Sequence, residues 1–417
     1  MSGQEPAEGE GRALATPEPA AAKPPQPPER GRMAGLLHEI ATGSALLTFL
    51  SLVLALLVGA VLIAASNEAV IAASKYFFSR PGDTFAAIGA AVGGAYTAMF
   101  QGSIIDISEY TLLRALRPLA DTLTYATPLI AAGLGVALAF RAGLFNIGAQ
   151  GQLIVGAIFA GYVGGSMNLP YGLHIVATVL AGLVGGALWA GIAGFLKART
   201  GAHEVIVTIM LNNIATFLVL YVLTTEVFRR EGRTDPIGRF MPESAQLWRL
   251  FGADSPVRTH FGLILALLAA VGVWWLLNRS TVGFGYRAVG FNPNAARTAG
   301  ISVERSYITV MLIAGALAGL AGVSQVLGTE LYLTSGVAGG IGFDAITVAL
   351  LGRSTPLGTV LAGLLFGALK AGGVVMQART GTAIDIVSVV QSMVVLFIAA
   401  PPLVRTIFRL KTKERSA

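Results

Sequence analysis

The sequence predicts an all-α polytopic membrane protein, and three observations lead to this fold class. Hydrophobic residues make up 54% of the 417 residues and charged residues only 12%, about half the charged share of a soluble globular protein. The mean hydropathy of +0.70 indicates more apolar surface than a soluble fold can bury. Apolar runs of about 20 residues, the helix length that crosses a bilayer core of about 30 Å, recur along the chain. We therefore expect about ten transmembrane helices, one of them short or broken.

Nine apolar stretches are long enough to be predicted spans. They are 45–65, 123–141, 150–167, 174–196, 205–226, 260–278, 305–328, 356–376 and 385–404. A shorter run, 342–352, ends in the helix-breaking sequence Gly-Arg-Ser-Thr-Pro. We predict a half-helix there, which lipid tolerates only where protein shields the broken backbone. The weaker Gly/Ala-rich segment 84–101 is predicted to be an extracytoplasmic amphipathic helix.

The two ends of the chain differ from the predicted membrane-spanning region, 41–410. Residues 1–40 are rich in Pro, Ala, Glu and Gly and have no apolar period, so we predict a disordered cytoplasmic tail. Residues 411–417 form a short basic tail. An even number of crossings puts both termini on one side, and the basic residues that follow the spans indicate the cytoplasm. The loop 228–259 is the exception, because it is predicted to be extracytoplasmic but contains six arginines.

Several functional classes are disfavoured by what the sequence lacks. It has no cysteine, which excludes disulfides and zinc–thiolate sites. We find no catalytic triad, no metal-ligand pattern and no GxxxxGK[ST] phosphate loop, so we predict neither an enzyme nor a metal site. The net charge of +7 fits basic cytoplasmic loops better than nucleic-acid binding. Ionisable residues are rare within the spans, which disfavours an ion-coupled secondary carrier; that class remains an alternative, and a membrane-embedded enzyme is a more distant one.

Small residues recur every four positions in three of the predicted spans. Gly182, Gly186, Ala190 and Gly194 share one helix face, and the pairs Gly315 with Gly319 and Gly363 with Gly367 repeat the spacing. Such stripes let helix backbones approach closely in lipid. We predict static close packing at these faces, with sliding during a conformational change as the alternative.

Polar residues in or near the spans are the candidates for a substrate pathway. They are Asn146, Gln150, Gln152, Glu204, Asn212, Asn213, Asp344, Thr347 and Lys370. Polar side chains at membrane depth face protein or water, so the alternative for each is a hydrogen bond that holds neighbouring helices together. Lys370 stands out, because a charge in the middle of a span needs a partner or a water-filled cavity.

The loop 279–304 contains signals for a short capped helix. Asn292 suits the N-cap, Pro293 the first helical position and Gly300 the position beyond the C-cap. The predicted helix, 293–299, carries Ala295 and Ala299 four residues apart, beside Ala296. A short helix with such a small-residue face fits a groove on a soluble partner; the alternative is an ordinary loop helix.

Four blocks resemble the ribose/nucleoside branch of ABC importer permeases, a branched-chain amino acid-like family. They are AGLFNIGAQGQLIVGA (142–157), HEVIVTIMLNNIA (203–215), AVGFNPNAARTAGI (288–301) and GFDAITVALLGRSTPLGTVLAGLLFGAL (342–369). The FNIGAQGQ form resembles the nucleoside, basic-membrane-protein-linked permeases more than the ribose permeases. The resemblance implies that residues 292–301 couple to an ATPase, with Asn292, Pro293, Asn294, Ala295, Ala296, Arg297, Gly300 and Ile301 in the docked segment.

The resemblance also implies an importer in a bacterial cytoplasmic (inner) membrane. We expect three protein partners: an ABC ATPase subunit with two fused nucleotide-binding domains, a second permease in a heterodimer, and a periplasmic or lipid-anchored substrate-binding protein. No cofactor is expected in this chain, because the ATPase would bind the ATP. Nucleosides are the expected substrates, and a simple sugar such as ribose is the alternative.

Overall fold

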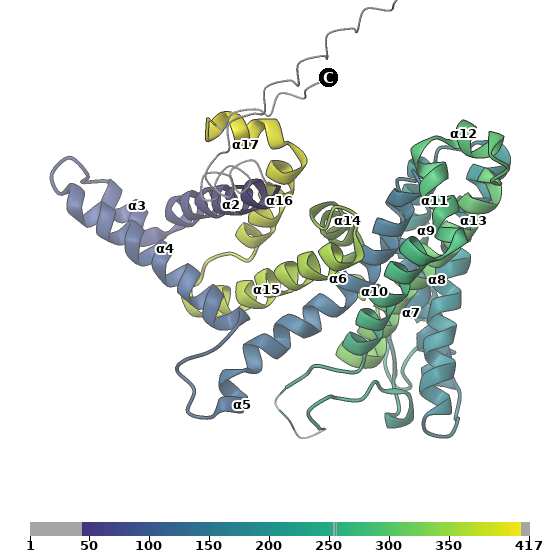
Figure 1. Cartoon of the computed structure of the whole chain (residues 1–417). Helices are drawn as coiled ribbons and strands as arrows, with labels where there is room; N and C mark the ends of the chain where they lie inside the picture. The colour runs from purple at the N-terminus through teal and green to yellow at the C-terminus, as the bar shows by residue number, and fades with distance from the viewer. Residues whose placement is uncertain (1–43, 253–254, 256, 410–417) are drawn as a thin grey trace, which may run out of the picture. The chain divides into compact units, whose positions relative to one another are not determined.

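The computed structural model describes residues 44–252, 255 and 257–409. The chain divides into two units, Met1–Leu46 and Leu47–Ala417, and of the first only Ser44–Leu46 are described. The predicted tails, 1–40 and 411–417, lie outside the described residues. Within the second unit almost every element is a helix (Figure 1), as the composition predicts.

Each of the nine predicted spans contains a long helix. These helices are α2 (Ser44–Ser66), α6 (Arg117–Arg141), α7 (Ala149–Ser166), α8 (Leu173–Thr200), α9 (Glu204–Thr224), α10 (Gly262–Arg279), α13 (Val303–Ser324), α15 (Pro356–Thr380) and α16 (Asp385–Ala399). Seven helical stretches of the described chain are long and apolar enough to cross a membrane, and α7 and α16 are not among them. The count of ten crossings and the cytoplasmic location of the termini therefore stay predictions.

Shorter elements connect or extend these helices. They are α3 (Glu68–Ser74), α4 (Pro81–Ser103), α5 (Leu112–Ala115), α11 (Thr281–Phe291), α12 (Pro293–Thr298), α14 (Ile341–Leu351), α17 (Pro401–Ile407), the 3-10 helix η1 (Glu243–Ala245), the π-helix η2 (Gln325–Thr329), and the strands β1 (Ile237–Phe240) and β2 (Tyr332–Thr334). The strands form a two-stranded antiparallel sheet, which the all-α prediction omits.

The predicted span 385–404 is wrong as one continuous helix. Helix α16 ends at Ala399, and α17 begins at Pro401 after an irregular Ala400. Proline has no backbone N–H to donate and disfavours helical geometry at the preceding residue. The Pro401-Pro402 pair therefore interrupts the apolar run.

The weak segment 84–101 forms the central part of a regular 23-residue helix, α4. Its C-terminal half packs closely on α15, where a Cβ added to Gly102 would meet Val375 and one added to Gly372 would meet the Met99 carbonyl. Beyond its end, Arg379 of α15 forms an ion pair with Asp106. Hydrogen bonds from Ser108 and the Arg379 guanidinium hold the pKa of Asp106 below its usual value, although partial desolvation opposes them.

The centre of the fold is a set of helices in glycine-mediated contact. A Cβ on Gly186 of α8 would lie 2.2 Å from the Gly315 carbonyl oxygen of α13, and one on Gly319 would lie 2.3 Å from the Gly182 carbonyl oxygen. Gly156 of α7 meets the same Gly319. Only glycine permits backbones this close, so the predicted close packing of these small-residue stripes is confirmed.

These contacts define two ends of the helix bundle. Helices α8 and α13 run antiparallel, because Gly182 lies against Val323 and Gly194 lies against Met311. The end that carries α11 and α12 is called the α12 end. The opposite end carries the 226–261 connection, and its strand β1 pairs with β2 after α13; it is called the loop end.

The predicted half-helix 342–352 is confirmed as α14, an 11-residue helix. It begins after Gly339 and Gly340, which have φ values of +45° and +81°. It ends before Arg353 and Ser354, which also have positive φ values, +53° and +50°. The left-handed conformation at two successive non-glycine residues sharply reverses the chain before α15.

Candidate functional site

A cavity of about 500 Å³ opens among α6, α15 and the segment that joins α13 to α14. On α6 its lining extends from Arg117 to Leu129, a rise of about 18 Å at 1.5 Å per residue. Arg258, from the 226–261 connection, lines it at the loop end. The cavity therefore runs from the loop end to the middle of the helix bundle.

The cavity wall combines backbone irregularities with polar side chains. Gln325 and Thr329 lie in the π-helix η2, a distortion that is frequent at functional sites. Pro128 of α6 also lines the cavity, and it cannot donate the helical hydrogen bond to the Thr124 carbonyl. Tyr125 adds an aromatic ring. The wall thus offers hydrogen-bond donors, acceptors and an aromatic face to a small ligand.

Lys370 of α15 lines this cavity and pairs with Asp344 of α14. The Lys370 ammonium nitrogen lies 2.7 Å from the Asp344 carboxylate, and each side chain is between a quarter and a third exposed. The sequence requires a partner or a cavity for Lys370, and the structure provides both. The pair joins the half-helix to the neighbouring long helix.

Two further contacts hold the ends of α14. At its start, the Gly342 amide donates to the Gln150 side-chain oxygen of α7, at 2.9 Å. At its end, the Arg141 guanidinium of α6 donates to the Ser354 carbonyl at 2.8 Å and to the Arg353 carbonyl at 3.4 Å. Thr347 lies half-buried between these contacts.

Three of the predicted pathway residues form a buried amide network toward the α12 end. The Asn146 and Gln152 side chains exchange hydrogen bonds of 3.2 and 2.9 Å. Asn212 of α9 accepts from the Gly151 amide at 2.8 Å and donates to the Ile147 carbonyl at 2.9 Å. All three side chains are at least 94% buried. Their polar groups serve as the link from α9 to the start of α7.

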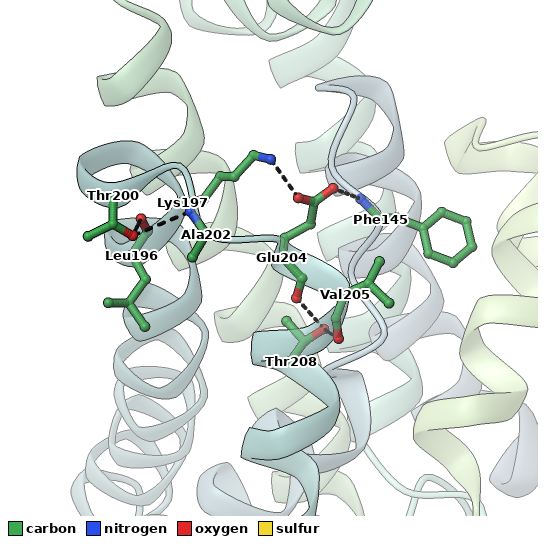
Figure 2. Close-up of polar contacts among 8 residues, drawn as sticks. All are labelled: Phe145, Leu196, Lys197, Thr200, Ala202, Glu204, Val205 and Thr208. Carbon is green, nitrogen blue, oxygen red and sulfur yellow. Dashed lines mark hydrogen bonds and ion pairs between the residues drawn. The ribbon is translucent and has the colours of Figure 1, made fainter.

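Asn213 and Glu204 lie apart from that network. Asn213 is exposed and donates to the Ile209 carbonyl within its own helix. Figure 2 shows Lys197 of α8 and Glu204 of α9 pointing toward each other across the turn that joins these helices, with nitrogen and oxygen 2.8 Å apart. The other Glu204 oxygen lies 3.5 Å from the Phe145 amide. Glu204 thus connects three segments at the α12 end.

The short helix predicted at 293–299 is confirmed as α12, and its caps are those expected. The Asn292 side chain accepts from the Asn294 and Ala295 amides at 3.0 and 3.1 Å. At the other end, the Gly300 amide donates to the Arg297 carbonyl and the Ile301 amide to the Ala296 carbonyl. This is the Schellman pattern, with Gly300 at φ +80°.

The two faces of α12 differ sharply. Ala296 is 4% exposed and packs with Val289 of α11 and Val303 of α13. Ala295 and Ala299 are exposed, and the neighbouring Phe291 is 94% exposed. Arg297 pairs with Glu304 at 2.9 Å. The surface available to a partner is therefore the Phe291, Ala295 and Ala299 side, whereas the Ala296 side chain packs inward. The coupling role of Ala296 stays a prediction.

Comparisons with known proteins agree with this architecture. Residues 119–399 match the family described as the branched-chain amino acid transport system permease component. The chain belongs to this permease family. It is 41% identical over 332 residues, 79% of this chain and 91% of the relative, to the guanosine ABC transporter permease protein NupP of Bacillus subtilis.

Two other relatives share most of their length with this permease. The glucose ABC transporter permease protein TsgB13 of Haloferax volcanii is 35% identical, covering 74% of this chain and 83% of the relative. The nucleoside ABC transporter permease protein NupB of Lactococcus lactis is 36% identical, covering 69% and 80%. No solved structure matches the permease significantly. With its membrane-spanning helices, the chain is a multi-pass membrane transport subunit, not an enzyme.

Sequence reasoning about the permease misses most of the cavity wall. Of the nine predicted pathway residues, Lys370 alone lines the cavity within the described chain. The missed charged residues are Arg117, Asp121, Arg258 and Glu330. Arg117 and Asp121 are four residues apart at the start of a span, which is the one local signal that could have indicated them. The helix α11, capped by the Ser280 side chain, is also missed.

Proposed function

We propose that this permease forms the translocation pathway of an ATP-binding-cassette importer for nucleosides. The observation that carries the proposal is 41% identity to a guanosine permease over 91% of that relative's length. A simple sugar is the second candidate substrate, favoured by the 35% identity to a glucose permease. The aromatic ring of Tyr125 in the cavity wall supports the nucleoside, because a base offers a flat face for stacking.

Energy comes from a separate ATPase subunit in this proposal. Helix α12 is its docking segment. Phe291, Ala295 and Ala299 form an exposed apolar surface on this helix and its two flanks. Two caps and a small apolar cluster hold the helix in place. The ATPase binds the ATP, and this chain needs no cofactor. The alternative is an ion-coupled carrier, in which uptake would collapse with the proton gradient while ATP stays high.

The other proposed partners are a second permease, a substrate-binding protein and the bilayer. Bacillus subtilis has another guanosine ABC transporter permease protein, NupQ, which is 29% identical to this chain over 259 residues, and this supports a heterodimer of two related permeases. A periplasmic or lipid-anchored binding protein would deliver substrate to the loop end. We place the complex in the bacterial inner membrane, with both termini and the α12 end in the cytoplasm and two fused nucleotide-binding domains in the ATPase.

The proposed pathway begins in the cavity and passes Lys370 and Asp344. Thr347 lies within α14, and Gln150 of α7 accepts a hydrogen bond at its start. Beyond them, toward the α12 end, lie Glu204 and the network of Asn146, Gln152 and Asn212. Asn213 faces away from these groups. Import would require the contacts of Glu204 and of the amide network to open.

The first experiment measures uptake of radiolabelled guanosine by the complete complex in proteoliposomes with internal ATP. We expect competition by other nucleosides and not by pentoses. Uptake that pentoses or glucose suppress, and nucleosides do not, would replace the nucleoside by a sugar. Uptake that persists without ATP hydrolysis would contradict the ABC assignment.

The coupling proposal is tested with Ala295→Glu. The side chain is exposed, so the change leaves the fold intact while it places a carboxylate in the docking surface. We expect guanosine uptake to fall roughly tenfold or more, since a buried unpaired charge at an interface costs several kcal/mol. In this variant, the substrate-binding protein should stimulate ATP hydrolysis much less than it does in the wild-type complex.

The matched control is Arg199→Glu, at the same end of the bundle but outside α12. It should retain most uptake if docking is specific to α12. Ala296→Glu is unsuitable, because Ala296 is buried and its replacement would unfold the segment. Unchanged uptake by Ala295→Glu at normal expression would contradict the proposed docking surface.

A further inference from the structure

The cavity at the loop end carries many charges, but they balance. Its wall contains three cationic side chains, Arg117, Arg258 and Lys370, and two carboxylates, Asp121 and Glu330. Asp344 supplies a third carboxylate through its ion pair with Lys370. Three positive and three negative groups leave no net charge around the cavity.

The Lys370–Asp344 pair determines whether this balance holds. Arg117 and Asp121 are neighbours on α6, 3.8 Å apart. Lys370 is on α15, and its ionic partner is Asp344 on α14, which does not itself line the cavity. Without the Asp344 charge, the Lys370 ammonium would face a ligand without its carboxylate partner, and the cavity would carry a net positive charge.

We propose that the cavity is a binding site for uncharged, hydroxyl-rich ligands, and that Asp344 sets this selectivity by neutralising Lys370. The identification of the ligand as a nucleoside rests on the proposed function; the preference for uncharged over anionic ligands does not. Asp344 is a specificity-determining residue in this view, although it acts through Lys370.

The chemistry of the wall supports this class of ligand. A volume of about 500 Å³ is within the range of small-molecule sites. Hydroxyl and amide groups of Thr124, Gln325 and Thr329 can exchange hydrogen bonds with ribose hydroxyls or a base edge, and Tyr125 can stack on the base. A phosphorylated analogue would lose the hydration of its phosphate and meet no excess cation, which disfavours its entry.

The competing explanation is that the pair only fastens α14 to α15. A purely structural ion pair predicts that its removal lowers stability and activity for all ligands alike. The proposed role predicts a change in the order of ligand preference. Ligand charge selectivity, and not activity alone, therefore separates the two explanations.

The test compares guanosine and guanosine 5′-monophosphate as ligands of the complete complex. In the wild type, the monophosphate should compete poorly for guanosine uptake. Asp344→Asn frees the Lys370 ammonium. The monophosphate should then inhibit uptake at a concentration at least roughly tenfold lower than in the wild type, as expected when a phosphate gains a charged hydrogen-bond donor. Lys370→Gln leaves an uncompensated carboxylate and should not show this gain.

The double variant Asp344→Asn with Lys370→Gln is the matched control. It removes both charges and keeps the cavity neutral, so its preference between the two ligands should resemble that of the wild type. If the double variant and Asp344→Asn show equal sensitivity to the monophosphate, or if neither differs from the wild type, the proposal is overturned.

A second measurement covers variants that fold but do not transport. The melting temperature of each purified chain in detergent micelles is recorded with guanosine, guanosine monophosphate, ribose or ribose 5-phosphate. Stabilisation of Asp344→Asn by both phosphorylated compounds, but not of the wild type, supports the proposal. A wild type that responds to ribose and not to guanosine would refute the nucleoside function while leaving the charge selectivity intact. Equal responses of all variants would refute the selectivity.

Discussion

The two ends of helix α6 border opposite kinds of polar environment. At the loop end, Arg117 and Asp121 line an open cavity, where polar groups are available to a ligand. Beyond the other end, Asn146 belongs to a buried network whose amide groups bond to protein. The difference shows that polar residues at membrane depth serve two purposes in one chain. Burial and hydrogen-bond partners, and not residue type, distinguish the polar residues that face the cavity from those that hold neighbouring helices together.

The largest effect is expected from disturbing a glycine contact at the centre of the helix bundle. Gly315→Ala would place a Cβ 2.2 Å from the Gly186 carbonyl oxygen and 2.4 Å from the Ala190 Cβ. The helices α8 and α13 would have to separate, at a cost of about 3 kcal/mol or more. Loss of monodisperse protein, or a markedly lower melting temperature in detergent, is the expected result.

The control for this change is Gly272→Ala on α10. No atom lies within 4 Å of a Cβ at Gly272, so the variant should be neutral, or more stable by about 0.5–1 kcal/mol because alanine has the higher helix propensity. Equal melting temperatures for the two variants would show that the close contact is not a requirement of the fold.

A smaller effect separates two adjacent asparagines that the sequence treats alike. Asn212→Ala removes the acceptor for the Gly151 amide and the donor to the Ile147 carbonyl in a buried environment, at a cost of about 1–3 kcal/mol. Asn213→Ala should change stability by less than about 0.5 kcal/mol, because Asn213 is exposed and bonds within its own helix. Chemical denaturation of the two variants measures the difference in the free energy of unfolding. If Asn213→Ala lowers that free energy as much as Asn212→Ala does, the contrast between buried, hydrogen-bonded residues and exposed ones is contradicted.

The smallest effect is expected at Lys197 and Glu204. The Lys197 side chain is 25% exposed and the Glu204 side chain 12% exposed, and ion pairs near a surface are worth about 1 kcal/mol or less. A double-mutant cycle with Lys197→Gln and Glu204→Gln should give a coupling energy of that size, reduced by high salt. A coupling energy above about 3 kcal/mol would instead rank this pair with the buried network.

The sequence predicts local features of this permease well and spatial combinations poorly. The caps of α12 were predictable, because Asn292, Pro293 and Gly300 act within a few residues of one another. The small-residue faces of α8 and α13 were predictable from residues at helical spacing, although the pairing of these two helices was not. Each predictable signal lies within one short segment.

The cavity was not predictable by the same reasoning. Its wall joins residues of α6, α15, the 226–261 connection and η2, and nothing local in the sequence places Arg258 near Lys370. The orientation of Ala296 also escaped, since three neighbouring alanines differ only in what packs against them. Asp344 and Lys370 were both identified, but their pairing depends on the position of α14 beside α15.

The backbone around α14 has a mechanical consequence. Gly339 and Gly340 precede this half-helix at positive φ values that suit glycine, whereas Arg353 and Ser354 follow it in a left-handed conformation that non-glycine residues adopt only under constraint. Arg141 clamps both of their carbonyl oxygens. This constrained turn links α14 firmly to α15, so a displacement of α14 would be transmitted to α15.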